Sequence, residues 1–163
     1  MSIRNFEKLF RPHSVALIGA SERPGSVGAV VARNLRRARF EGELLLVDPN
    51  LTNLNGMTVY RDVARLPHPP DLAVIATPPD TVPGLVAELG ARGTRAAVVI
   101  TAGFDESGGA LQRAVLEAAR PHLLRLIGPN CVGLIVPGIG LDASFSHLRR
   151  RKVISPLSAS PAQ

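Results

Sequence analysis

The stretch VALIGASERPGSVG, residues 15–28, decides the fold. An apolar run at 15–18 passes into a loop with three glycines and then into a segment whose apolar residues have helical spacing. Gly19, Gly25 and Gly28 read G-x5-G-x2-G, whereas nicotinamide-binding turns carry G-x-G-x-x-G. The stretch therefore predicts a strand, a glycine-rich turn longer than that fingerprint, and a helix.

The same alternation continues along the chain. Strands are predicted at 15–18, 44–47, 58–60, 72–76, 96–100 and 124–127, and helices at 27–39, 81–91 and 109–119. Asp80 is the expected N-cap of the second helix, and Pro121 is expected to end the third. The strand segments are continuously apolar, as in parallel sheets that are covered on both faces. We therefore predict an α/β protein with a Rossmann-like, doubly wound parallel sheet in a single domain, residues 1–147.

The turn-forming residues gather after the predicted strands. Parallel sheets bind ligands outside the carboxyl ends of their strands, where the strand order reverses. The loops expected at that edge are GASERPGSVG (19–28), DPN (48–50), TPPD (77–80), TAGFDESGG (101–109) and GPNCVG (128–133). Their convergence predicts a binding crevice.

Composition narrows the classes of function. The chain has 163 residues and a formal net charge of +6, but Arg149, Arg150, Arg151 and Lys152 supply four of its 19 basic residues. The remainder carries 15 basic and 13 acidic side chains, and there is no tryptophan, so a nucleic-acid partner is not expected. Residues 148–163 are basic and then rich in serine and proline, which predicts a disordered tail. No apolar run is long enough to span a membrane. A single cysteine and the absence of a signal-like N-terminus lead us to expect a cytoplasmic protein.

The residues of the glycine-rich loop at 19–28 are of types that suit anion binding. Glycines allow close approach of the backbone to a ligand, and the N–H groups near Ser26 and Gly28 at the start of a helix favour an anion. The hydroxyls of Ser21 and Ser26 would add donors. The alternative is a turn that only packs helix against strand.

Asp48 allows two interpretations. It follows Gly28 by twenty residues, where nicotinamide-binding proteins place the acid that holds the ribose hydroxyls. Pro49 turns the chain at once, however, and Asp48 could equally accept a hydrogen bond from its own loop.

No catalytic or metal-binding constellation is evident. The four histidines, His13, His68, His122 and His147, have no serine, cysteine or carboxylate at a catalytic spacing, and the first two are expected to be solvated. Cys131 is expected to be a small buried residue.

Taken together, five segments resemble the CoA-binding domain of the NDP-forming acyl-CoA synthetases. This family includes ADP-forming acetate–CoA ligase and the succinyl-CoA synthetase α subunit. The matching segments are SVALIGASERPGSVG, VDPN, AVIATPPDTV, VVITAGFDESG and LIGPNCVGLIVP, and they cover about residues 8–147.

The resemblance implies a site for CoA or acyl-CoA. By this likeness Pro24, Gly25, Ser26 and Val27 line the pyrophosphate site, with Ser21 and Gly28 in the same loop. Pro49 and Asn50 border the adenosine part, Thr77 and Pro78 the pantetheine path, and Ile100, Thr101 and Ala102 lie beside the bound CoA.

The resemblance also implies parts that this sequence does not contain. In the family a second domain carries a phosphorylated histidine, and an ATP-grasp part completes ligation. We therefore expect an isolated or truncated CoA-binding domain that does not ligate by itself. Two alternatives remain: an NAD-binding module of an oxidoreductase or sensor, and an interaction subunit that completes a split synthetase in trans.

Overall fold

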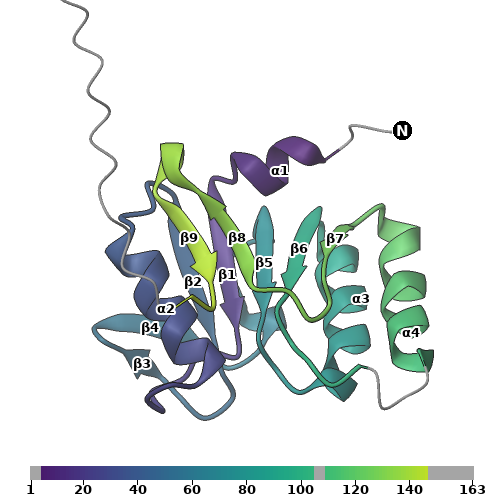
Figure 1. The fold of residues 1–163 in the computed structure, drawn as a ribbon, viewed down its shortest axis with the longest axis horizontal. Helices are drawn as coiled ribbons and strands as arrows, with labels where there is room; N and C mark the ends of the chain where they lie inside the picture. The colour runs from purple at the N-terminus through teal and green to yellow at the C-terminus, as the bar shows by residue number, and fades with distance from the viewer. Residues whose placement is uncertain (1–4, 105–108, 147–163) are drawn as a thin grey trace, which may run out of the picture.

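The computed structural model describes residues 5–104 and 109–146, in which a seven-stranded sheet forms the centre (Figure 1). The strands are β1 (Ser14–Ile18), β2 (Glu43–Val47), β3 (Asn53–Leu54), β4 (Met57–Tyr60), β5 (Leu72–Ile75), β6 (Ala96–Val99) and β7 (Arg125–Ile127). Their order is β3-β4-β2-β1-β5-β6-β7, and every pairing except β3 with β4 is parallel. The predicted Rossmann-like parallel sheet is confirmed. The expected tail, His147 and residues 105–108 lie outside the described residues.

Both faces of the sheet are covered. One face packs against α1 (Phe6–Phe10), α2 (Val27–Arg37) and a hairpin of β8 (Gly133–Val136) and β9 (Leu141–Ser144). The other packs against η1 (Val63–Arg65), α3 (Val82–Arg92) and α4 (Ala110–Ala119). All of β1 is buried, and its residues alternate between the two cores, which explains its continuous apolar run.

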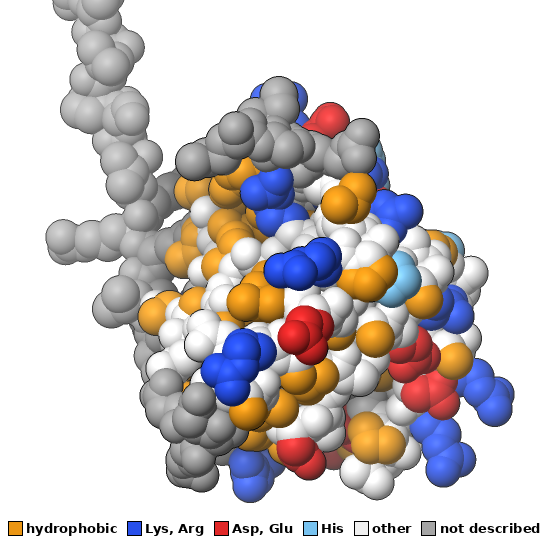
Figure 2. Space-filling view, turned by 90° about the vertical axis from the view of Figure 1, so that its right-hand side faces the viewer, with side chains coloured by type: hydrophobic (Ala, Val, Ile, Leu, Met, Phe, Trp, Pro, Cys, Tyr) orange, Lys and Arg blue, Asp and Glu red, His pale blue; other side chains and the backbone are white. Residues whose placement is uncertain are grey.

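The surface on the α3–α4 side is mixed in character. Figure 2 shows this side of the molecule, the right-hand side of Figure 1, with basic and acidic side chains interspersed among hydrophobic ones. None of the described helices is long and apolar enough to cross a membrane.

The β8–β9 hairpin was not predicted. Its β9 strand packs against α2 with Leu141 and Ala143 fully buried, and the side-chain amide of Asn34 donates to the Ser144 carbonyl at 2.9 Å. The hairpin turn is η5 (Pro137–Ile139), which contains Gly138 and is followed by Gly140. Because glycine and proline weaken a strand signal and β8 is only partly buried, the local sequence gave little indication of strands here.

Helix ends differ from prediction in two places. Asp80 is not the N-cap of α3, because Pro79 begins a 3-10 turn, η2 (Pro79–Thr81), and α3 then begins after Thr81. The helix expected over 27–39 ends at Arg37. The prediction for Pro121 is confirmed, since α4 ends at Ala119 and the chain passes into η4 (Arg120–His122).

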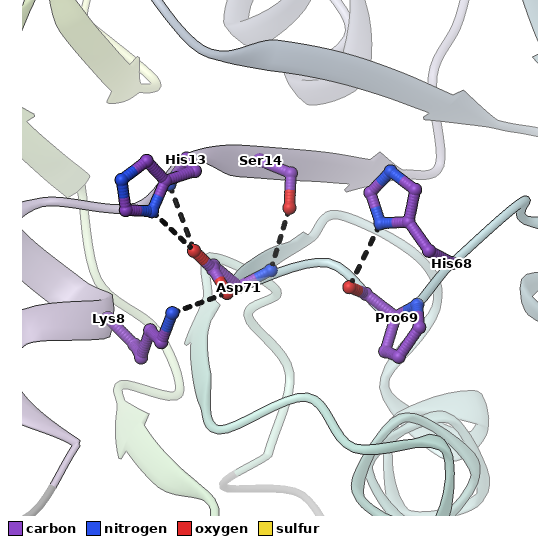
Figure 3. A network of polar contacts seen from close by, with 6 residues as sticks. All are labelled: Lys8, His13, Ser14, His68, Pro69 and Asp71. Carbon is purple, nitrogen blue, oxygen red and sulfur yellow. Dashed lines mark hydrogen bonds and ion pairs between the residues drawn. The ribbon is translucent and has the colours of Figure 1, made fainter.

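Asp71 joins three segments at the amino end of β5 (Figure 3). Its carboxylate accepts the backbone N–H of His13 at 3.0 Å and lies 2.9 Å from the ammonium group of Lys8 in α1. Its own backbone N–H donates to the Ser14 hydroxyl at 3.0 Å. Burial alone would raise the pKa of Asp71, but the His13 N–H and Lys8 outweigh it, so the pKa lies below its ordinary value. This carboxylate therefore ties α1 and β1 to β5 in its charged form.

His68 lies at the same edge of the sheet. Its ring nitrogens are 3.2 Å from the Pro69 carbonyl oxygen and 2.6 Å from a Glu43 carboxylate oxygen. Both partners accept hydrogen bonds, so the two contacts are both hydrogen bonds only when both ring nitrogens carry a proton. The Pro69 carbonyl and then Glu43 accordingly raise the pKa of His68. His13 and His68 are both solvent-accessible as expected, but each also contacts a carboxylate.

We expect His68→Gln to lower the melting temperature at pH 5.5 and to have a smaller effect at pH 8.5. The folded pKa lies above the ordinary value of 6.5, so the stabilisation is complete below that value and is lost as pH rises through the folded pKa. The pair is largely exposed, so the effect should not exceed about 1 kcal/mol, or roughly 2–4 °C. Thermal melts at both pH values measure it, with Glu43→Gln expected to give the same pattern. An equal loss at both pH values would contradict the assignment.

Candidate functional site

The reversal of strand order falls between β1 and β5. The chain passes from β1 to β2 and β4 on one side, and from β5 to β6 and β7 on the other. The loops that follow β1 and β5 therefore leave in opposite directions, which opens a space at the carboxyl ends of these strands. A cleft of about 580 Å³ lies there, lined by the loops after β1, β2, β4 and β5 and by one face of α3.

Two glycines allow the walls of the cleft to approach each other. Gly19 has φ +91°, and a Cβ atom there would lie 2.8 Å from the Ala76 carbonyl oxygen. A Cβ atom at Gly28, in the first turn of α2, would collide with the Gly19 carbonyl oxygen. Gly25 differs, because its φ is +79° but no atom lies within 4 Å of the position of a Cβ. Gly19 and Gly28 thus serve packing, whereas Gly25 leaves bare, accessible backbone.

The start of α2 offers backbone donors. Ser26 is the N-cap, and its hydroxyl accepts from the Ala29 N–H at 3.3 Å and donates to the Arg23 carbonyl at 2.8 Å. The Val27 and Gly28 N–H groups belong to the first turn, where no intrahelical acceptor is available. No acidic residue lies in that turn. This helix end is therefore suited to an anion.

The serine hydroxyls stabilise the loop. Ser21 accepts the Arg23 N–H at 3.1 Å, and the Ser26 hydroxyl is bonded at both its donor and its acceptor positions. The Ser26 hydroxyl is thus engaged within the loop, whereas the Ser21 hydroxyl uses only its acceptor there and keeps its O–H group as a donor beside the N–H groups.

Asp48 binds its own loop. One of its carboxylate oxygens accepts the Asn50 N–H at 2.8 Å and the Leu51 N–H at 3.1 Å. This turn holds Pro49 and Asn50 exposed at the rim of the cleft. Asp48 therefore accepts hydrogen bonds from its own loop, which is the second of the two interpretations drawn from the sequence.

Thr101 holds the loop after β5 in place through a buried hydrogen bond. Its hydroxyl, in a side chain that is almost fully buried, donates to the Thr77 carbonyl at 2.8 Å. Its own carbonyl accepts the Asn130 N–H at 2.9 Å. The loops after β5, β6 and β7 are therefore linked through one residue, which positions Thr77 at the cleft.

The structure brings most of the predicted site residues together. Those that line the cleft are Ser21, Ser26, Val27, Gly28, Pro49, Asn50, Thr77 and Pro78. Pro24 and Gly25 are exposed on the same glycine loop. Ile100 and Thr101 are buried beside the cleft and Ala102 is exposed, and none of these three is part of the lining.

Several lining residues were missed. Arg23, Arg61 and Glu88 place charged side chains in the cleft, and Leu85 adds an apolar one. Arg61 follows the last residue of β4, so its position after a strand was a usable signal. Leu85 and Glu88 lie one turn apart on α3, and nothing local in the sequence indicates which way that face points.

Among the described residues that line the cleft there is no histidine, cysteine or lysine. The Cys131 thiol is half-buried and donates to the Val99 carbonyl oxygen at 3.3 Å, and burial raises its pKa. Within residues 5–104 and 109–146, no cluster of three histidine, cysteine or carboxylate side chains could hold a metal ion.

Comparison with known proteins gives matches over most of the chain. A family model described as a CoA binding domain matches residues 13–137. ADP-forming acetate–CoA ligase I of Archaeoglobus fulgidus is 41% identical over 149 residues, which are 90% of this chain and 22% of that ligase. The α subunit of ADP-forming acetate–CoA ligase I of Pyrococcus furiosus is 34% identical, over 86% of this chain and 32% of the subunit.

Solved structures agree with the sequence relatives. The fold is similar to that of the dinucleotide forming acetyl-coenzyme A synthetase 1 of Ca. Korarchaeum cryptofilum, solved in complex with phosphate and ADP, with a TM-score of 0.81 and 35% identity. The match covers 86% of this chain and 30% of that one. The chain thus spans between about a fifth and a third of the length of these relatives.

We expect Thr101→Val to destabilise the fold by about 1–2 kcal/mol, because it removes a buried donor and leaves the Thr77 carbonyl without it. Thr94→Val is the matched control. Thr94 is fully buried, and its hydroxyl has no hydrogen-bond partner among the described residues, so its replacement should be neutral or stabilising. Urea unfolding measures both free energies. Equal losses for the two variants would show that the Thr101 hydroxyl bond contributes nothing.

Proposed function

The chain belongs to the CoA-binding domain family found in ADP-forming acyl-CoA synthetases, and we propose that it binds CoA or an acyl-CoA in the cleft at the carboxyl ends of β1 and β5. One observation carries the proposal: the first turn of α2, which contains no acidic residue, presents the Val27 and Gly28 N–H groups at a cleft of suitable size. A pyrophosphate is the part of CoA that such a helix end would bind.

Each part of the cleft suits a part of the ligand. The exposed backbone at Gly25 and the start of α2 would receive the pyrophosphate, and Arg23 and Arg61 would add positive charge. The Asp48 turn with Pro49 and Asn50 would border the adenosine. Thr77 and Pro78, held by Thr101, would guide the thin pantetheine arm. These groups bind and orient the ligand without a covalent step.

We further propose that these 163 residues supply the CoA site of a synthetase whose phosphorylated histidine and nucleotide-binding part lie elsewhere. Two of the described histidines, His13 and His68, lie at the amino ends of the strands, away from the cleft. The third, His122, packs against Gly90 of α3. The α subunit from Pyrococcus furiosus is the kind of relative that supports a role beside other chains.

We expect Gly25→Asp to weaken CoA binding at least about tenfold, or ~1.4 kcal/mol. The added carboxylate would lie where the pyrophosphate approaches, while the open space around a Cβ and the tolerance of aspartate for positive φ should preserve the fold. Isothermal titration at fixed salt measures the affinity, and a thermal melt confirms folding.

Gly25→Asn is the control for this test. It adds a side chain of nearly the same shape and the same tolerance of positive φ without the charge, so it should lose much less affinity than Gly25→Asp. Equal losses would place the effect in the backbone and not in the anion site. If the unaltered chain does not bind CoA, the proposed function is wrong.

Asp48→Asn separates the CoA proposal from the NAD alternative. The asparagine side-chain oxygen can still accept the Asn50 and Leu51 N–H groups, so the turn should persist. CoA affinity should be unchanged or improved, because a negative charge near phosphate is removed. An NAD site would instead lose affinity with the loss of its ribose acceptor. Titration of both proteins with CoA and with NAD distinguishes the two, and binding of NAD alone would favour the alternative.

A further inference from the structure

A second groove, of about 700 Å³, runs along α2 on the side of the β3–β4 hairpin. Arg33, Arg36 and Arg37 line it from α2, and Asn55 lines it from the hairpin turn. Ser21 lines both this groove and the cleft, so the two are neighbours. We propose that the groove binds the 3′-phosphate of CoA and thereby distinguishes CoA from dephospho-CoA, an inference that rests on the proposed function.

The three arginines form one unsatisfied cationic face. Their spacing of three and four residues places them on the same side of α2, where like charges repel. Among the residues that the structure describes, none of the three guanidinium groups has an ion-pair or hydrogen-bond partner. Glu22 is the single acidic residue in the lining. A phosphate bound here would relieve the repulsion and accept paired hydrogen bonds from the planar guanidinium groups.

The arginine side chains on α2 lean toward the end of the helix that lies at the cleft. Helical side chains lean toward the amino end of their helix, which for α2 is the end at the cleft. Arg33 follows the N-cap Ser26 by seven residues, or about 10 Å along the helix axis. A long side chain that leans back over part of this distance brings its charge close to an anion at the start of α2.

CoA has a third phosphate at a matching place. Its 3′-phosphate is attached to the same ribose whose 5′-oxygen carries the pyrophosphate, so the two anionic groups are separated by a single sugar. A pyrophosphate at the start of α2 therefore keeps the 3′-phosphate within reach of the helix face. The groove is larger than a phosphate, so its size admits the 3′-phosphate.

The test compares two ligands and three proteins. The full chain, the triple variant Arg33→Gln, Arg36→Gln, Arg37→Gln, and the control Arg120→Gln are titrated with CoA and with dephospho-CoA at fixed salt. Arg120 follows α4 on the other face of the sheet and is exposed, so the control removes charge away from the groove. Glutamine keeps helix propensity close to that of arginine, and thermal melts check the fold. If the triple variant is unstable, Arg33→Gln alone replaces it.

We expect the unaltered chain and Arg120→Gln to bind CoA at least tenfold more tightly than dephospho-CoA. The triple variant should reduce this ratio to about twofold or less by weakening CoA alone. Equal affinity of the unaltered chain for both ligands would overturn the inference and leave the proposed function standing. An equal loss for both ligands in the triple variant would also overturn it, because the arginines would then act only through general charge. Binding of neither ligand by the unaltered chain would overturn both.

Discussion

The close contact between the turn after β1, the first turn of α2 and the loop after β5 is the constraint on which the site depends. Gly19 and Gly28 have no room for a Cβ atom, because carbonyl oxygens occupy those positions. Their small size lets α2 begin directly at the end of β1, so its first N–H groups point into the gap where the strand order reverses. The same contact fixes the direction of α2 across the sheet, and with it the place of the β9 strand that packs on α2.

The two edges of the sheet differ in the groups that they contain. At the amino edge, Asp71 and His68 use charged groups to join α1, β1, β2 and β5, and their shifted pKa values show that the charged forms are the stabilising ones. At the carboxyl edge, backbone groups and small residues surround an open cleft. The buried Thr101 hydroxyl holds one of its loops by donating to the Thr77 carbonyl.

The helix α2 links the proposed site to the groove beside it. Its amino end attracts anions through unpaired N–H groups, and its exposed face adds three arginines. Only its buried face, with Val31 and Leu35, serves the core. On the two proposals above, one helix would provide two kinds of anion recognition for a ligand with phosphates at two positions on one ribose.

The sequence by itself determined six of the seven strands of the sheet, the bounds of α2, α3 and α4 to within two residues, and three of the loops that line the cleft, but not α1 or β3, and no described residue of the predicted loops 101–109 and 128–133 is part of the lining. Continuous apolar strands and the glycine turn at 19–28 suffice for this, because they record locally that both faces of each strand are buried and that the backbone must turn tightly. Only the tertiary structure decided that Thr101 supports the cleft without lining it and that Asp48 binds its own loop. It also decided that β8 and β9 cover α2 and that Arg33, Arg36 and Arg37 face a hairpin. Periodicity tells which side of a segment is apolar, but the partner of each side depends on strand order and packing between residues far apart in the chain.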